Sequence, residues 1–151
     1  MPQSLTQIYL HVVFSTKERA RYFQSEALRC DLHAYLAKAC NNMNANAIIV
    51  GGAEDHIHVA CSFPRQLTVS NFMRDLKRES SKWIKTQRTD LASFAWQDGF
   101  AAFSLSPSHL ETIKVYIANQ MEHHRKESFQ AEMRRVFQKY DVTFDEKYVW
   151  G

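Results

Sequence analysis

Residues 48–63, IIVGGAEDHIHVACSF, combine two apolar runs with a Gly-Gly pair and a His-Ile-His triplet. Alternate side chains of a β-strand share a face, so His56 and His58 would point one way and Ile57 and Val59 the other. Two neutral imidazoles on a rigid strand make half of a metal site. An isolated His-x-His is also common on the wet face of ordinary strands. The triplet therefore predicts a metal site only if the chain supplies another ligand.

Composition points to one folded domain spanning residues 1–151, with a C-terminal helix and tail from about residue 127. Of its residues 45% are hydrophobic and 13% aromatic, with only 4 Gly and 3 Pro, which argues against disorder. We expect no membrane span, because no apolar run reaches the required length. The start of the chain does not resemble a signal peptide, and three cysteines without a CxxC suit a reducing cytoplasm.

Hydrophobic periodicity predicts the order of the secondary structure. Strands are expected over residues 8–15, 47–50, 56–63, 94–97 and 100–105, and helices from Ser25 to about 40, over 69–87, over 109–124 and over 129–140. The segments 94–97 and 100–105 are expected to pair as a hairpin about Asp98-Gly99. This order describes a small α+β domain of the ferredoxin-like type, with helices packed on an antiparallel sheet.

Two segments concentrate positive charge. A polar loop containing Lys17 and Arg19 follows the first strand, and the second helix carries Arg74, Lys77, Arg78, Lys82, Lys85 and Arg88. Most basic helix faces are simply solvated. Here only Asp75 and Glu79 dilute the cations, so a face that contacts nucleic-acid phosphates is the alternative interpretation. The net charge of +3 permits such a partner without requiring one.

The helix after Pro107 contains the missing ligand candidate. Tyr116, Asn119, Gln120 and His123 recur at helical spacing and form one polar face, which we expect to be the outer one. By itself this face could hold no more than a boundary tyrosine and a surface amide.

Four segments together indicate a family. They are HVVFSTK at 11–17, GGAEDHIHV at 51–59, WQDGFAAFS at 96–104 and YIANQ at 116–120. In order and spacing they closely resemble the single-tyrosine HUH transposases of the IS-200/IS-605 group, where HUH denotes histidine, hydrophobic residue, histidine. The resemblance covers nearly the whole chain, and the combination of His-x-His with a later Tyr-x3-Gln is its most specific part.

The resemblance implies a function and a role for each motif residue. It implies a ferredoxin-like fold of HUH endonuclease type, a homodimer, and transposition of single-stranded, hairpin-forming DNA. Tyr116 would be the nucleophile that forms a 5′-phosphotyrosine. His56 and His58, with Gln120 as third ligand, would bind Mg²⁺ or Mn²⁺. Lys17, Arg19, Arg74, Lys77, Lys82 and Lys85 lie in segments where such proteins meet DNA.

Two other functions stay open on the sequence. One is a protein on the same fold that binds DNA hairpins without cutting them. The other is a metal-independent oligomeric scaffold in which Tyr116 only packs. The segment from residue 127 onward resembles chromosomal relatives of these transposases, so whether the chain moves its own element is a further open point.

Overall fold

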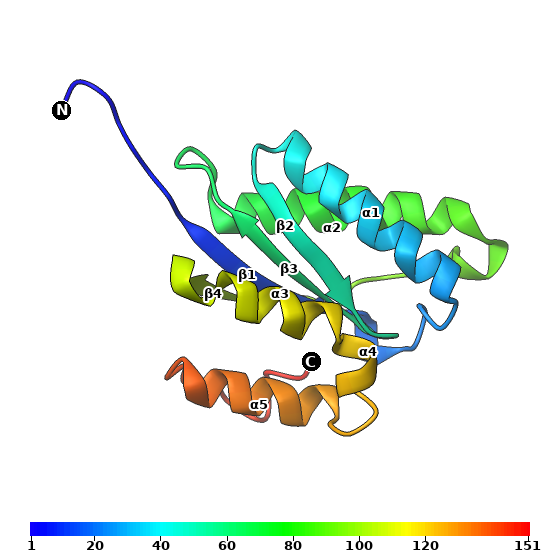
Figure 1. The fold of residues 1–151 in the computed structure, drawn as a ribbon. Helices are drawn as coiled ribbons and strands as arrows, with labels where there is room; N and C mark the ends of the chain where they lie inside the picture. The colour runs from blue at the N-terminus through cyan, green and yellow to red at the C-terminus, as the bar shows by residue number, and fades with distance from the viewer.

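A four-stranded antiparallel sheet, with strand order β2-β3-β1-β4, forms the centre of the computed structural model, which describes all 151 residues (Figure 1). The strands are β1 (Tyr9–Ser15), β2 (Asn46–Gly52), β3 (His56–Ser62) and β4 (Ala101–Leu105). Strands β1 and β3 pair along their full lengths and occupy the middle of the sheet. This is the antiparallel arrangement of a ferredoxin-like α+β fold, as predicted.

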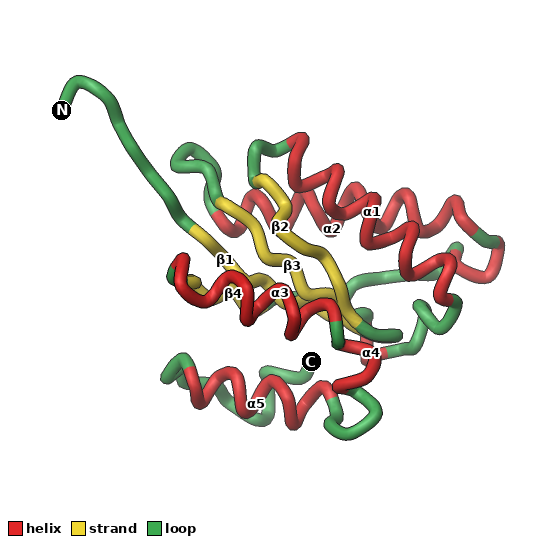
Figure 2. The backbone as a smooth tube through the Cα atoms, viewed as in Figure 1, coloured by secondary structure: helices red, strands yellow, loops and turns green.

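Helices cover both faces of the sheet (Figure 2). The helices are α1 (Glu26–Asn42), α2 (Val69–Gln87), α3 (Leu110–Ala118), α4 (Gln120–His123) and α5 (Phe129–Lys139), with short 3₁₀ turns at Lys17–Arg19, Thr89–Leu91 and Pro107–His109. Helices α1 and α2 share the large hydrophobic core on one face. Helices α3 and α5 pack on the other face through two smaller cores. None of the helices is long and apolar enough to cross a membrane.

Strand β3 is buried on both faces, and its residues alternate between the two cores. Ile57, Val59 and Cys61 belong to the large core under α1 and α2. Ala60 packs against Ile117 of α3 on the opposite face. By the two-residue period of a strand, His56 and His58 share the face of Ala60 and therefore lie beneath α3 and α5.

The prediction of a hairpin over residues 94–105 is wrong. Only Ala101–Leu105 forms a strand, and Trp96 makes a single isolated bridge to Thr16. The side chains of Phe94 and Trp96 enter the large core instead of lining a sheet. The Lys77 ammonium donates hydrogen bonds to the carbonyls of Gln97 and Gly99, which ties this segment to α2.

The helix expected over 109–124 is interrupted. A 3₁₀ turn precedes Leu110, α3 ends at Ala118, and Asn119 (φ −100°, ψ 20°) departs from helical geometry before α4 begins. The Asn119 N–H still donates to the Val115 carbonyl of α3, and the His123 and His124 N–H groups donate to the carbonyls of Asn119 and Gln120, so α4 follows α3 without a loop between them. Tyr116 therefore belongs to α3 and Gln120 to the first turn of α4.

Gly51 sets how closely α3 approaches the sheet. A Cβ atom at Gly51 would lie 2.6 Å from the Ile117 carbonyl oxygen and 2.7 Å from Ile117 Cγ2. We expect Gly51→Ala to push α3 off β2 and to lower the free energy of unfolding by about 1–3 kcal/mol, as overpacking does. Urea denaturation measures the change. A variant as stable as the parent would show that α3 does not depend on this close approach.

Candidate active site

His56 and His58 lie side by side in the middle of the molecule, and both are fully buried. His56 Nδ1 is 2.7 Å from Asp55 Oδ1. A carboxylate accepts a hydrogen bond only from a protonated nitrogen, so in the neutral ring the proton is on Nδ1 and the lone pair is on Nε2. Asp55 thus orients His56 with its ligating nitrogen toward α4, as an outer-shell carboxylate does for a metal-binding histidine.

Tyr116 and Gln120 converge on the histidines from the helix above. The Gln120 side chain is 1% exposed, and its Oε1 lies 3.0 Å from His56 Nε2. The Tyr116 ring stands edge-on to His58, with ring centroids 5.6 Å apart. The prediction that these two residues form an outer polar face is wrong, because α5 closes over that face. The structure nevertheless brings all four predicted residues together.

His11 of β1 is a further member of the site that the sequence did not single out. His11 Nε2 is 2.8 Å from His58 Nδ1, and the two rings stack. Burial lowers the pKa of His11 to about 3 and that of His58 to about 4, so both rings are neutral at neutral pH. When a cation takes the Nε2 lone pair of His58, the proton of its neutral ring is on Nδ1 and is donated to His11 Nε2.

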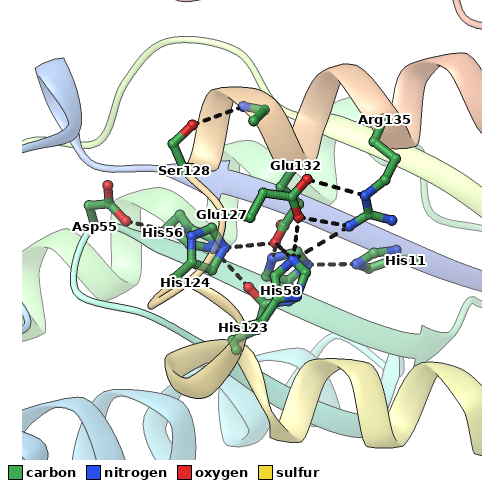
Figure 3. Close-up of polar contacts among 12 residues, drawn as sticks. His11, Asp55, His56, His58, His123, His124, Glu127, Ser128, Glu132 and Arg135 are labelled. Atoms are coloured by element: carbon green, nitrogen blue, oxygen red, sulfur yellow. Dashed lines mark hydrogen bonds and ion pairs between the residues drawn. The ribbon is translucent and has the colours of Figure 1, made fainter.

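Glu132 of α5 enters the site from above (Figure 3) and was also missed by the sequence. It is fully buried, with Oε1 3.1 Å from His58 Nε2 and Oε2 2.7 Å from His124 Nε2. These imidazoles hold the pKa of the Glu132 carboxyl far below its ordinary value, against the opposite effect of its burial. Nothing in the local pattern around Glu132 distinguishes it from the many charged residues of a surface helix.

The donor set fits a divalent cation. Five buried polar atoms at the site have no hydrogen-bond partner: His11 Nδ1, His58 Nε2, Gln120 Nε2, Glu132 Oε1 and the Tyr116 hydroxyl. Buried polar atoms are normally paired, so such a group marks a place where a ligand is expected. One nitrogen each of His56 and His58 and one oxygen of Glu132 lie within 4.8 Å of one another. Imidazole, amide and carboxylate donors suit manganese, and oxygen donors suit magnesium.

The Tyr116 phenol is neutral in this environment. Burial, and secondarily the negative Glu132, raises its pKa well above the ordinary value near 10. The Arg135 guanidinium acts in the opposite direction but is itself paired with Glu127. The tyrosine is therefore a protonated hydroxyl held in a dry site, and it needs nearby positive charge to become a nucleophile.

The predicted DNA-contacting residues fall in two places. Arg19 lines a pocket of about 510 Å³ beside the site, which also includes Arg21, Asp55, His124 and Arg125. The basic helix α2 lies on the other face of the sheet, away from His56 and His58 (Figure 1). There Lys77 is bound to carbonyls of its own chain, and Glu79 lies 3.9 Å from Lys82.

Known proteins share this fold and sequence. Residues 4–120 match the family model for IS200-like transposases. The chain is 30% identical over 117 residues to the transposases for insertion sequence element IS200 of Salmonella typhimurium and Salmonella typhi, covering 74% of this chain and 76% of each relative.

Two solved structures have a similar fold. A transposase candidate from Deinococcus radiodurans superposes with a TM-score of 0.61 at 16% identity, covering 78% of this chain and 94% of its own. A REP-associated tyrosine transposase bound to a REP hairpin gives a TM-score of 0.53 at 13% identity, covering 95% of this chain and 90% of its own.

The antiparallel α+β fold, with two histidines on the central strand β3 beneath the helix α3 that carries Tyr116, defines a protein of the HUH type. The family match places it among DNA-processing enzymes. The chain belongs to the family of IS200-like transposases.

Acid should destabilise the metal-free protein through its buried imidazoles. His11 and His58 have folded pKa values of about 3 and 4 against an ordinary 6.5. The unfolded chain then binds more protons below pH 6.5, so the free energy of unfolding should fall as the pH drops from about 6.5 toward 5. Urea denaturation in chelator at several pH values measures this slope. His11→Gln should make the slope shallower and the exposed-site control His109→Gln should not; equal slopes would refute the assignment.

Proposed function

We propose that this protein cleaves and rejoins single-stranded DNA, with Tyr116 as the nucleophile and a divalent cation at His56, His58 and Gln120. The observation that supports the proposal most is the convergence of these residues. Tyr116 and Gln120 are some sixty residues away from the His-x-His pair in sequence, yet their side chains meet the pair in one buried site. Packing alone does not favour burying an amide, a phenol and two imidazoles together when the Tyr116 hydroxyl, Gln120 Nε2 and His58 Nε2 have no partner.

The protein residues prepare the site for a phosphate group. A Mg²⁺ or Mn²⁺ ion, when bound, would neutralise charge on the scissile phosphate and stabilise the developing negative charge. Asp55 orients His56, and His11 orients His58, so that each presents Nε2. The Gln120 amide contributes its oxygen next to His56.

Tyr116 carries out the group transfer. Its oxygen attacks phosphorus and loses its proton, and the 3′ oxygen leaves and gains one. The products are a 5′-phosphotyrosine and a free 3′-hydroxyl. The phosphoester link retains the energy of the broken bond, so rejoining to another 3′-hydroxyl needs no nucleotide cofactor. Dry surroundings also keep water from hydrolysing the intermediate.

A DNA hairpin is the substrate we favour. The related tyrosine transposase of known structure is bound to a REP hairpin. In this chain α5 covers the histidines, so the pocket containing Arg19, Arg21 and Arg125 is the open surface next to the site. Guanidinium groups suit phosphate recognition by charge and geometry.

A homodimer is the assembly we propose, on the family resemblance. Strand β4 is an edge of the sheet, and its outer side has no partner strand in the chain. Its apolar residues Phe103 and Leu105 are used in the chain's own cores, so pairing would rest on backbone groups. A monomeric mass in solution, with and without DNA, would contradict this.

Tyr116→Phe tests the reaction. The substitution removes one oxygen and little packing, so folding and hairpin binding should change little, whereas cleavage and covalent adduct formation should disappear. End-labelled hairpin DNA is incubated with the protein and Mn²⁺, resolved on a denaturing gel, and any adduct is mapped by mass spectrometry.

Tyr140→Phe is the matched control, because Tyr140 packs on Phe103 away from the histidines. It should retain full cleavage. Absence of any adduct with the parent protein, together with intact hairpin binding, would favour the non-cleaving hairpin-binding alternative. An adduct that persists in Tyr116→Phe would assign the nucleophile elsewhere.

Salt dependence tests the DNA surface. Each lost phosphate contact should reduce the slope of log affinity against log salt by roughly 0.7 for single-stranded DNA. We expect neutralisation of Arg19, Arg21 and Arg125 to glutamine to lower the slope by about 2 in total. The comparison variant neutralises Arg74, Lys82 and Lys85 on α2. A drop only in the α2 variant would move the DNA to the opposite face of the sheet.

A further inference from the structure

We propose that Glu132 is a fourth ligand of the metal and lets this chain bind Mn²⁺ before DNA arrives. The inference rests on the metal site of the proposed function but goes beyond the His-x-His and Tyr-x3-Gln motifs. Glu132 is on α5, outside the residues 4–120 that match the family model.

The two oxygens of Glu132 have different surroundings. Oε2 is close to two imidazoles, 2.7 Å from His124 Nε2 and 3.1 Å from His123 Nε2. Oε1 lies 3.1 Å from His58 Nε2, but the two atoms are not aligned for a hydrogen bond, and both are without a partner. The carboxylate is thus held by one oxygen while the other points to the lone-pair side of a metal-binding histidine (Figure 3).

The spacing of these atoms matches that of neighbouring ligands around one ion. Metal–ligand distances of about 2.1 Å place adjacent ligands of an octahedron about 3.0 Å apart. The structure has 3.1 Å between Glu132 Oε1 and His58 Nε2, and 3.0 Å between Gln120 Oε1 and His56 Nε2. The second pair places the Gln120 amide beside the His56 nitrogen that Asp55 leaves unprotonated, so both groups can bind one cation.

The charge of Glu132 also requires a cation. A fully buried carboxylate is costly unless it is paired with positive charge or a metal. Arg135, three residues after Glu132 in the chain, pairs with Glu127 at 3.1 Å instead. The ion-pair contacts of the Glu132 carboxylate are to the imidazoles of His58, His123 and His124, and none is to a lysine or an arginine.

A carboxylate changes what the site can do alone. His56, His58 and Gln120 are neutral and would hold a cation weakly until DNA oxygens complete the shell. Adding the negative Glu132 raises affinity in the absence of DNA, because ligand charge is a main determinant of affinity for hard cations. It also couples metal binding to the docking of α5 on the sheet.

The experiment is a Mn²⁺ titration of the full chain without DNA. Electron paramagnetic resonance measures the concentration of free Mn²⁺ at each step. The parent should bind one Mn²⁺ ion. We expect Glu132→Gln, which keeps the shape and one hydrogen-bond acceptor for His124, to weaken binding at least about tenfold, the loss that even an outer-shell partner typically causes. Added hairpin DNA should recover part of that loss.

Glu127→Gln is the matched control. Glu127 contacts His123 and Arg135 in the same cluster but does not face His56 or His58, so its loss should leave Mn²⁺ affinity unchanged. His58→Ala should abolish binding. His123→Ala should not, which separates this site from the cluster of His123, His124 and Glu132. Equal or tighter Mn²⁺ binding by folded Glu132→Gln would overturn the proposal and make Glu132 a purely structural partner of the histidines.

Hydrogen exchange of the parent supplies a readout that needs no variant. Mn²⁺ without DNA should slow exchange of the α5 amides if Glu132 is a ligand, and leave them unchanged if it is not. The titration is independent of the tyrosine chemistry and can be run on Tyr116→Phe. Failure of adduct formation with normal Glu132-dependent Mn²⁺ binding would reject the proposed reaction while leaving this inference intact.

Discussion

The burial of β3 on both faces is the constraint on which the rest of the structure depends. A central strand normally carries apolar residues in both directions, and Ile57, Val59 and Cys61 meet that demand on the side of α1 and α2. On the other face of β3, His56 and His58 place polar side chains at buried positions. Two buried imidazoles must find polar neighbours there: Asp55 from the preceding turn and His11 from β1 hydrogen-bond to them, and the Glu132 carboxylate of α5 lies 3.1 Å from His58.

The break in the helix at Asn119 does not separate Tyr116 from Gln120 in the site. An unbroken helix would keep Tyr116 and Gln120 on one face, one turn apart. The departure at Asn119 still leaves Gln120 in contact with His56, while Tyr116 stays over His58. The close approach of Ile117 to Gly51 holds α3 near enough to the sheet for both contacts. The Gly-Gly pair is thus part of the site's geometry, although it contributes no side chain.

Sequence reasoning succeeded where a local period or a spaced motif carried the information. The alternation at 56–59 correctly predicted a strand with both histidines on one face, and the antiparallel α+β fold followed from the order of elements, although one of the five expected strands does not form. Sequence reasoning failed where tertiary contacts determine the local structure. The segment about Trp96 has the composition of a strand, but its side chains are taken into the core and Lys77 binds its backbone. Likewise, the burial of Gln120 depends on α5, whose position no local pattern reveals.

Helix α5 shows why the site and the C-terminal segment cannot be considered separately. Met133, Val136 and Phe137 pack on Val13 and Phe103 of the sheet. Val13 is the register partner of His58, so the apolar contact that docks the helix lies directly beside the histidine. Glu132 directly precedes Met133 on α5. The packing of Met133 on the sheet therefore places Glu132 next to His58. Apolar packing thus supplies the energy that buries a carboxylate against imidazoles, and a cation bound there would in turn stabilise that same packing.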